Sequence, residues 1–259
     1  MKNFFLAICL LIAAQISNAQ DLKKYDKGNF IKGKDSIYYR ILFPENFNPS
    51  QKYPVLFVLH GRGESGSDNE KQLTHGAKLF LKDDVRRNFP AIIVFPQCPL
   101  DSYWANVNIT TNDKGKRNFA FVEGGKPTKA MHALQSMVKD FLKKPFVNKE
   151  QVYVGGLSMG GMGTYELLRR QRRTFAAAFA ICGGDNTNNI QKYKNTPLWI
   201  FHGGKDDIVD PAFSMAIAER LKLVGKEVKF TLYPNANHNS WDSAFAEPEL
   251  LPWLFGHKK

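Results

Sequence analysis

The sequence predicts an α/β fold: a mostly parallel, twisted sheet with helices on both faces. Two observations support this. Short, continuously apolar runs recur along the chain, and helix-like segments separate most of them. A run without polar alternation is typical of a strand that is buried on both faces of a parallel sheet, and alternation of such strands with helices is the pattern of strand–helix–strand units. About 240 residues follow the N-terminal leader described below, which fits one large domain better than two small ones.

The predicted strands are rich in β-branched and aromatic residues, and turn-forming residues separate them. Their ranges are Ser36–Phe43, Tyr53–His60, Ala91–Pro96, Gln151–Gly156, Phe175–Cys182, Pro197–His202 and Val228–Tyr233. The predicted helices are Lys71–Leu81, Thr128–Lys143, Met159–Arg170, Pro211–Leu223 and Glu247–Phe255. The segment Asp101–Pro127 is polar and irregular. It is either part of a substrate rim at the strand ends or a plain surface loop.

The N-terminus predicts a cleaved signal peptide over residues 1–19. Lys2 precedes an apolar run from Phe4 to Ala14, and Ser17-Asn18-Ala19 then offers the small residues that a signal peptidase reads. The run is too short to span a bilayer, and no later stretch is long and apolar enough. We therefore expect a soluble, secreted or periplasmic product with one catalytic domain over residues 20–259.

Charge and cysteine content set further bounds. The leader carries one lysine and no acid, so its removal lowers the formal charge from +12 to +11. Such basicity permits attraction to anionic polysaccharide or envelope surfaces, but Lys and Arg are spread along the chain, which favours ordinary solubility over a polyanion site. Cys98 and Cys182 remain and fall at the ends of different predicted strands, so two free thiols are favoured over a disulfide, which stays open.

The strongest local signal is Gly156-Leu157-Ser158-Met159-Gly160, a G-x-S-x-G motif. It directly follows a predicted strand and directly precedes a predicted helix. A nucleophilic serine must stand clear of the sheet on such a tight turn, and glycines on either side remove side chains that would collide there. The following helix also directs its N-terminus toward developing negative charge. Ser158 is therefore the candidate nucleophile.

A serine nucleophile needs a base that is itself oriented by a third group. His238 follows the last predicted strand in the loop NANHNSW and is the candidate base. The candidate acid is Asp206, in the turn GGKDDIV after the preceding strand, which gives the chain order Ser, Asp, His. Asp207 is the alternative acid, and Asp210 is a weaker one. Among the other histidines that follow the serine, His202 ends a strand as part of a His-Gly turn.

Two backbone N–H groups are needed to stabilise a tetrahedral oxyanion. One is expected from Met159, directly after the nucleophile, and the other from Arg62, in the glycine-rich loop His60–Gly66. Glu64 either anchors this loop or faces solvent. The aromatic side chains of Trp104 and Trp241 are the candidate substrate contacts, with packing against the catalytic loops as their alternative role.

Other chemistries have little support in the sequence. There is no His-Glu-x-x-His motif and no paired cysteine spacing, so we expect no metal and no cofactor. The chain contains no phosphate-binding G-x-x-x-x-G-K-[ST] motif, and its Lys and Arg residues predict no clustered basic face. We therefore expect no nucleic-acid partner, and we make no prediction of oligomeric state.

From about Ser36 to the C-terminus the chain resembles a known group of enzymes. The resemblance is carried by His60-Gly61-Arg62-Gly63-Glu64, by Gly156–Gly161, by His202-Gly203 with Asp206, and by His238–Trp241. These motifs are similar to those of secreted esterases of the α/β-hydrolase fold, including feruloyl and acetyl xylan esterases and the phospholipase/carboxylesterase group, often called predicted peptidases. In many relatives the residue after His-Gly is small, whereas Arg62 stands here.

This resemblance implies a serine esterase that acts on acylated plant polysaccharide fragments or on small aryl and alkyl esters through an acyl-enzyme. The first rival function is a serine peptidase on the same scaffold, because an identical triad cleaves amides. The second is a non-catalytic carbohydrate-binding protein that has kept the fold. Sequence alone identifies neither the acyl group nor the alcohol.

Overall fold

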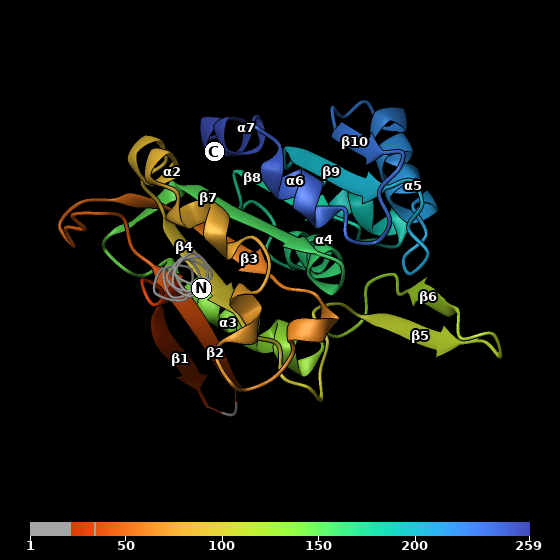
Figure 1. The fold of residues 1–259 in the computed structure, drawn as a ribbon, viewed down its shortest axis with the longest axis horizontal. Coiled ribbons are helices and arrows are strands. Elements are labelled where there is room, and N and C mark those ends of the chain that lie inside the picture. Colours follow the sequence, from red (N-terminus) through yellow and green to blue (C-terminus); the bar gives the residue numbers. More distant parts are fainter. Residues whose placement is uncertain (1–21, 34) are drawn as a thin grey trace, which may run out of the picture.

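The computed structural model describes residues 22–33 and 35–259, so the predicted signal peptide lies outside the described residues. An eight-stranded sheet has the order β1-β2-β4-β3-β7-β8-β9-β10. The pairs β1–β2 and β2–β4 are antiparallel, and the other pairs are parallel. This confirms the predicted α/β class (Figure 1). The strands are β1 (Asp26–Lys32), β2 (Asp35–Leu42), β3 (Tyr53–Leu59), β4 (Ile92–Pro96), β7 (Val147–Leu157), β8 (Ala177–Ile181), β9 (Leu198–Gly203) and β10 (Lys229–Tyr233).

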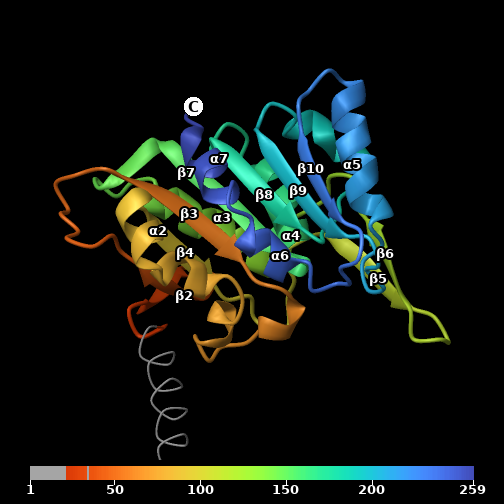
Figure 2. The ribbon, with the colours of Figure 1, turned by 45° about the horizontal axis from the view of Figure 1, so that its top comes forward.

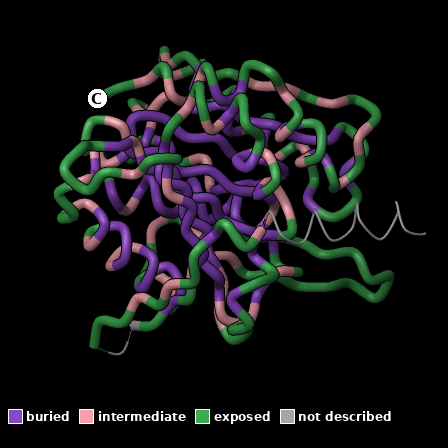
Figure 3. The backbone as a smooth tube through the Cα atoms, turned by 60° about the vertical axis from the view of Figure 1, so that its left-hand side comes forward, coloured by how far each residue is buried: buried purple, intermediate pink, exposed green. Residues whose placement is uncertain are grey.

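Helices cover both faces of the sheet, and each face has its own apolar core (Figure 2). The first core packs α3 (Lys129–Phe141), α4 (Met159–Arg170) and α5 (Ala212–Leu223) on the sheet. The second packs α2 (Asp83–Asn88), α6 (Trp241–Ala246) and α7 (Leu250–Gly256) on the other face. Figure 3 shows that buried residues gather in the middle of the molecule and that exposed residues surround them. Within the described ranges, no helix is long and apolar enough to cross a membrane.

Helix α3 shows how sequence pattern produces this layering. Its buried residues recur every three to four positions, which places them on one face of a helix. Thr128 caps the N-terminus, because its hydroxyl accepts a hydrogen bond from the Met131 N–H at 3.1 Å. The apolar face therefore packs on the sheet while the charged face meets solvent.

Several boundaries differ from the predictions. The predicted helix Lys71–Leu81 is instead two short 3₁₀ helices, Lys71–Leu73 and Ala77–Leu81. Gly76 separates them with a φ of 79°, a left-handed conformation that ends a helix. The predicted helix Glu247–Phe255 begins only at Leu250, after Pro248, and β1, α2 and α6 were not predicted. Short elements of this kind carry too few residues to show a period.

The segment Asp101–Pro127 was predicted to be irregular, and that prediction is wrong for its middle. It contains a hairpin of β5 (Val107–Thr111) and β6 (Arg117–Phe121), which projects from the body of the molecule (Figure 1). Gly115 permits the turn with a φ of 77°. Most of the hairpin's residues are exposed on both faces, so the strands lack the apolar alternation that reveals a strand in sequence.

The carboxyl ends of β3 and β7 meet the start of α4 with almost no space between their backbones. A Cβ on Gly160 would lie 2.0 Å from the Leu59 carbonyl oxygen. A Cβ on Gly156 would lie 2.5 Å from the Gly160 carbonyl oxygen and 2.6 Å from that of Leu59. The glycines of the G-x-S-x-G motif are therefore required by backbone contact between three elements.

Gly160→Ala tests this constraint. We expect it to lower the free energy of unfolding by about 2–3 kcal/mol, because its neighbours are backbone atoms that cannot rotate away. Gly256→Ala is the matched control, since a Cβ there meets nothing within 4 Å. Urea denaturation of both variants measures the difference, and equal stability of the two would contradict the packing argument.

Candidate active site

Ser158 stands on the turn between β7 and α4 in a strained backbone conformation. Its φ is 52° and its ψ is −118°, a combination that non-glycine residues rarely adopt. The strain is held from both sides, because the Ser158 N–H donates to the Ile181 carbonyl at 2.8 Å and the Ser158 carbonyl accepts from the Met162 N–H at 3.0 Å. The turn lifts the Ser158 side chain, which is only partly buried, out of the packed backbone.

His238 links the serine to a carboxylate. Its Nε2 lies 2.9 Å from the Ser158 Oγ, and its Nδ1 lies 2.8 and 3.0 Å from the two carboxylate oxygens of Asp206. The three side chains come from turns that follow β7, β9 and β10, which are parallel and end at one edge of the sheet. Ser158 and Asp206 lie 80 and 32 positions before His238 in the sequence, and the three side chains therefore meet in one hydrogen-bonded line.

Asp206 is buried and receives more hydrogen bonds than the sequence suggested. Besides His238, the backbone N–H groups of Ile208 and Val209 donate to its Oδ1 at 3.0 and 2.9 Å. His202 Nε2 lies 3.1 Å from its Oδ2. Burial by itself would raise the pKa of Asp206, but these donors outweigh it and hold the pKa well below its ordinary value. The carboxylate is therefore ionised at neutral pH.

His202 is a residue of the site that the sequence analysis missed. It was seen only as the end of a strand, and the structure places its ring, fully buried, against the carboxylate of Asp206. The ring is held on its other side, where Nδ1 lies 2.7 Å from the Ser214 Oγ. The one available signal was its position four residues before Asp206 at the end of a buried strand.

The alternative acids lie outside this arrangement. Asp207 is exposed, and its N–H donates to the Asn237 side chain at 3.2 Å. Asp210 is also exposed, and its carboxylate accepts from the Ala212 N–H at 2.9 Å at the start of α5. Of the three acids in this loop, only Asp206 contacts the imidazole of His238.

The loop after β3 lies directly beside the serine. A Cβ on Gly61 would lie 3.6 Å from the Ser158 Cβ. His60 fixes this loop, because its Nδ1 donates to the Gly61 carbonyl at 2.6 Å while its Nε2 accepts from the Cys98 N–H at 2.8 Å. Burial lowers the pKa of His60 to about 4, so the ring keeps this neutral pattern at ordinary pH. The peptide bond between Gly61 and Arg62 is trans, so the Arg62 N–H points opposite to the Gly61 carbonyl and away from the His60 ring.

Met159 supplies the other predicted N–H group. It is the first residue of α4, so its N–H has no carbonyl one turn earlier in the helix to accept it. Its side chain is fully buried. The N-terminus of α4 and the loop after β3 thus flank Ser158 with backbone donors, the arrangement that stabilises an oxyanion.

The side chain of Arg62 turns away from the serine. Its guanidinium donates to the carbonyl groups of Ser102 and Leu100, both at 2.7 Å. It also lies 5.9 Å from the centre of the Tyr103 ring. The charge of Arg62 is therefore used to tie the loop after β3 to the segment that leads into the hairpin.

The two candidate aromatic contacts have different positions. Trp241 is half-buried and packs edge-on against His238 at 5.3 Å between ring centres, and it also meets His75 at 5.0 Å. Glu64 lies behind this pair, with its carboxylate 3.7 Å from the His75 ring nitrogen. Trp241 thus lies directly beside the candidate base.

Trp104 lies beneath the site and has no exposed surface. Its ring packs 5.6 Å from that of His60, and a Cβ on Gly163 would lie 2.5 Å from the Trp104 Cβ. This burial contradicts the expectation that Trp104 contacts substrate. The indole instead fills the space between the loop after β3 and α4, which is the packing role that the sequence left as the alternative.

Cys98 and Cys182 are both free and buried. The Cys182 sulfur, the Asp206 carboxylate and a His238 ring nitrogen lie within 4.8 Å of one another, which is close enough to hold a metal ion. Burial raises the pKa of the Cys182 thiol well above its ordinary value, and the other two groups are hydrogen-bonded to each other. A thiol that is held in its protonated form is a poor metal ligand, because the thiolate is the form that binds metal.

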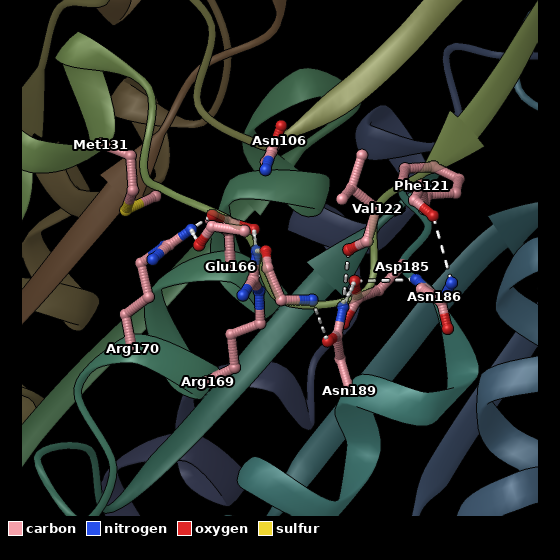
Figure 4. A network of polar contacts seen from close by, with 12 residues as sticks. Asn106, Phe121, Val122, Met131, Glu166, Arg169, Arg170, Asp185, Asn186 and Asn189 are labelled. Carbon is pink, nitrogen blue, oxygen red and sulfur yellow. Dashed lines mark hydrogen bonds and ion pairs between the residues drawn. The ribbon is translucent and has the colours of Figure 1, made fainter.

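The hairpin is fixed at its base by a network of buried polar groups (Figure 4). The Asn189 amide donates to the Val122 carbonyl at 3.2 Å and accepts from the Gly124 N–H at 3.0 Å. Asp185, which is buried, accepts from the Asn189 amide at 2.8 Å and from the Tyr193 hydroxyl at 3.0 Å. Its carboxylate therefore orients the amide that holds the hairpin.

A buried ion-pair cluster on α4 holds the next residues of the same segment. Glu166 accepts from Arg169 Nε at 2.9 Å and from Arg170 Nε at 2.6 Å. The two guanidinium groups donate to the Gly124 and Gly125 carbonyls at 2.7 and 3.0 Å (Figure 4). The helix that follows Ser158 therefore also anchors the base of the hairpin.

Asp185→Asn gives a pH-dependent test of this anchor. Burial raises the pKa of Asp185 to about 6, above its unfolded value. Between about pH 4 and pH 6 the folded state thus binds the proton more tightly, so the contribution of Asp185 to stability falls as pH rises. We expect the unfolding free energy of wild type, taken relative to that of the variant, to decline from about pH 4 to pH 6 and to be level at higher pH. Urea denaturation at intervals of pH measures it, and a difference that stays constant would contradict the assignment.

Comparison with known proteins agrees with this geometry. The model of the phospholipase/carboxylesterase family matches residues 48–247. Lysophospholipase-like protein 1 of Mus musculus is 27% identical over 191 residues, which are 71% of this chain and 79% of that protein. The bifunctional acetylxylan esterase/xylanase XynS20E of Neocallimastix patriciarum is 27% identical over 180 residues, 69% of this chain and 22% of that protein.

Among solved structures, a thermostable esterase superposes with a TM-score of 0.81 at 28% identity, covering 93% of this chain and 64% of that one. The chain thus spans most of the mouse relative but less than two thirds of the esterase and about a fifth of the fungal enzyme. The family model covers well over half of this chain. The chain therefore belongs to the phospholipase/carboxylesterase family, and thereby to the carboxylic ester hydrolases with the α/β-hydrolase fold.

Proposed function

We propose that this chain hydrolyses carboxylic esters through an acyl-enzyme, with Ser158 as nucleophile, His238 as base and Asp206 as the supporting acid. The observation that carries the proposal is the hydrogen-bonded line from the Ser158 Oγ to His238 Nε2 at 2.9 Å and from His238 Nδ1 to Asp206 at 2.8 Å. In this arrangement each group performs the role that ester hydrolysis requires of it.

In the first half-reaction the Ser158 Oγ attacks the ester carbonyl while its proton passes to His238 Nε2. The carbonyl oxygen becomes an oxyanion, and the backbone N–H groups of Met159 and Arg62 stabilise it. The intermediate expels the alcohol, which takes the proton from His238. In the second half-reaction water attacks the acyl-enzyme by the same route, the acid leaves, and the proton returns to Ser158. Asp206 stays ionised and stabilises the imidazolium throughout.

Acylated carbohydrate or aryl esters are the substrate class that we favour. The hairpin is mostly exposed, and its Phe119 shares an apolar cluster with Met162 and Val209, three residues from Asp206. A lipase would present a broad apolar lid beside its site. Trp241 beside His238 offers a flat face for a sugar or aromatic ring. An acetylxylan esterase among the relatives is consistent with this choice. The apolar, Lys-preceded leader supports secretion or a periplasmic location, where polymer fragments are met.

Ser158→Ala tests the nucleophile. We expect the loss of ester hydrolysis and of labelling by a fluorophosphonate probe, because among the described residues only the Ser158 hydroxyl is hydrogen-bonded to the His238 imidazole. The partly buried hydroxyl adds little packing, so the fold and its thermal unfolding should stay unchanged. Substantial hydrolysis by the folded variant would exclude Ser158 as the nucleophile.

Asp206→Asn and its neighbour Asp207→Asn form a matched pair for the acid. We expect Asp206→Asn to lower kcat by about ten-thousand-fold, the size of the effect in a related triad, because the amide stabilises the wrong histidine tautomer. Asp207 does not contact the imidazole, so Asp207→Asn should cost little. Steady-state kinetics on an aryl acetate measures both variants, and the reverse order would move the acid by one residue.

A substrate panel tests the ester class and the rival functions together. It compares kcat/KM for acetylated xylooligosaccharide, methyl ferulate, a long-chain acyl ester and a peptide amide. We expect the carbohydrate or aryl ester to be cleaved fastest. Preference for the long acyl chain points to a lipase, and preference for the amide points to a peptidase. Binding of oligosaccharide without turnover or probe labelling would indicate a carbohydrate-binding protein.

A further inference from the structure

Two adjoining grooves lie at the amino ends of β8, β9 and β10, at the end of the sheet opposite Ser158. The segment 194–197, which leads into β9, lines both of them, so the two form one continuous depression. Their volumes are about 720 and 680 Å³. We call this depression the rear groove. It shares no lining residue with the candidate active site.

The first half of the rear groove is lined by basic side chains from three separate segments. Lys194 precedes β9, Lys222 lies near the end of α5, and Lys226 and Lys229 flank the entrance to β10. Glu227 is the one acidic residue among its lining residues. The positive charges therefore outnumber the negative charge several-fold on this surface.

The second half repeats this excess. Arg172 and Arg173 follow α4, Lys192 precedes the shared segment, and Lys258 and Lys259 belong to the C-terminal tail. Glu150 is the one acid that lines it. Across the ranges that the structure describes, none of the basic side chains of either half is in an ion pair. Their charges are thus available to an outside partner.

The fold holds several of these cations in place. The Tyr153 hydroxyl donates to the His257 carbonyl at 2.7 Å, and the Lys259 N–H donates to the Glu150 carbonyl at 3.1 Å. These bonds tie the C-terminal tail to β7. Lys229 is also fixed, with its ammonium 3.5 Å from the centre of the Trp199 ring. Charges that are already positioned lose less conformational entropy when a ligand binds.

Shape and aromatic content indicate which polyanion fits. The depression is concave, which suits a single polymer chain better than the flat surface of a membrane. Trp253 and Phe230 line the first half, and both are half-buried. A half-buried ring offers a face for the apolar side of a sugar, while the surrounding lysines suit a carboxylate on that sugar.

The sequence analysis favoured ordinary solubility because the basic residues are spread along the chain. In the structure, the amino ends of parallel strands meet at one end of the sheet. Segments 172–173, 192–194, 222–229 and 258–259 are distant in sequence and line the rear groove together. Basic residues that are spread along the chain therefore gather on one face.

We propose that the rear groove binds an acidic polysaccharide, a chain of sugars that carry carboxylate groups. The choice of polysaccharide over other polyanions rests on the proposed function, in which the substrate is an acylated carbohydrate. β9 has six residues, which separates the groove from the active site by about 20 Å. A polymer held at the rear groove leaves the site free and raises the local concentration of its acyl groups.

The test compares two fourfold variants of the full mature chain. The groove variant carries K192Q, K194Q, K226Q and K258Q. The control carries K52Q, K78Q, K82Q and K143Q, which removes the same charge from exposed lysines outside the groove. Isothermal titration measures the Kd for polygalacturonate, which has no ester to hydrolyse. A single-stranded oligonucleotide and vesicles of phosphatidylglycerol are the competing probes, and turnover of p-nitrophenyl acetate is measured in parallel.

We expect polygalacturonate to bind wild type and control equally and the groove variant about tenfold more weakly, with affinity falling as salt rises. Turnover of the small ester should be the same in all three proteins. Equal weakening in the control variant, or no binding by wild type, would overturn the proposal. Tighter binding of oligonucleotide or vesicles through the same lysines would also overturn it. Failure of ester turnover alone would instead count against the proposed function.

Discussion

The site depends on one packing constraint, the contact of three backbones at the carboxyl ends of β3 and β7 and the start of α4. Gly156 and Gly160 have no room for a Cβ, because the Leu59 carbonyl occupies that space. This contact places Ser158 in its strained conformation and brings the loop after β3 against the nucleophile. The hydroxyl, the N-terminus of α4 and the glycine-rich loop thus have one common origin.

Near this contact, two buried carboxylates, those of Asp206 and Glu166, each accept several hydrogen bonds. Two imidazoles and two backbone N–H groups point at the single carboxylate of Asp206. The opposite side of α4 carries Glu166 and its two arginines, which fix the base of the hairpin. Helix α4 therefore follows Ser158 at its start and anchors the base of the hairpin through its last turn.

Most of the sheet and the three central site residues were predictable from sequence. The buried strands were continuous apolar runs, and Ser158, Asp206 and His238 followed strands in an order that one fold explains. The geometry agrees with all three, and the family assignment agrees with the fold. The predicted signal peptide falls outside the described residues.

The features that could not be predicted from the sequence depend on contacts between segments that are distant in the chain. His202 is a residue of the site only because the turn after β9 folds Asp206 back onto its ring. Trp104 looked like a surface aromatic in a polar segment, yet α4 and His60 enclose it. The basic residues of the rear groove come from segments that are distant in sequence, and the parallel strand order brings these segments together.

The most direct test of this account is peptide mapping by mass spectrometry after reaction of the native chain with a fluorophosphonate. The reagent reports a serine activated by its neighbours, which is the central claim. The account predicts one adduct per chain, located on Ser158, with labelling lost when the protein is unfolded beforehand. An adduct on a different residue, or a folded chain that hydrolyses esters and yet stays unlabelled, would contradict it.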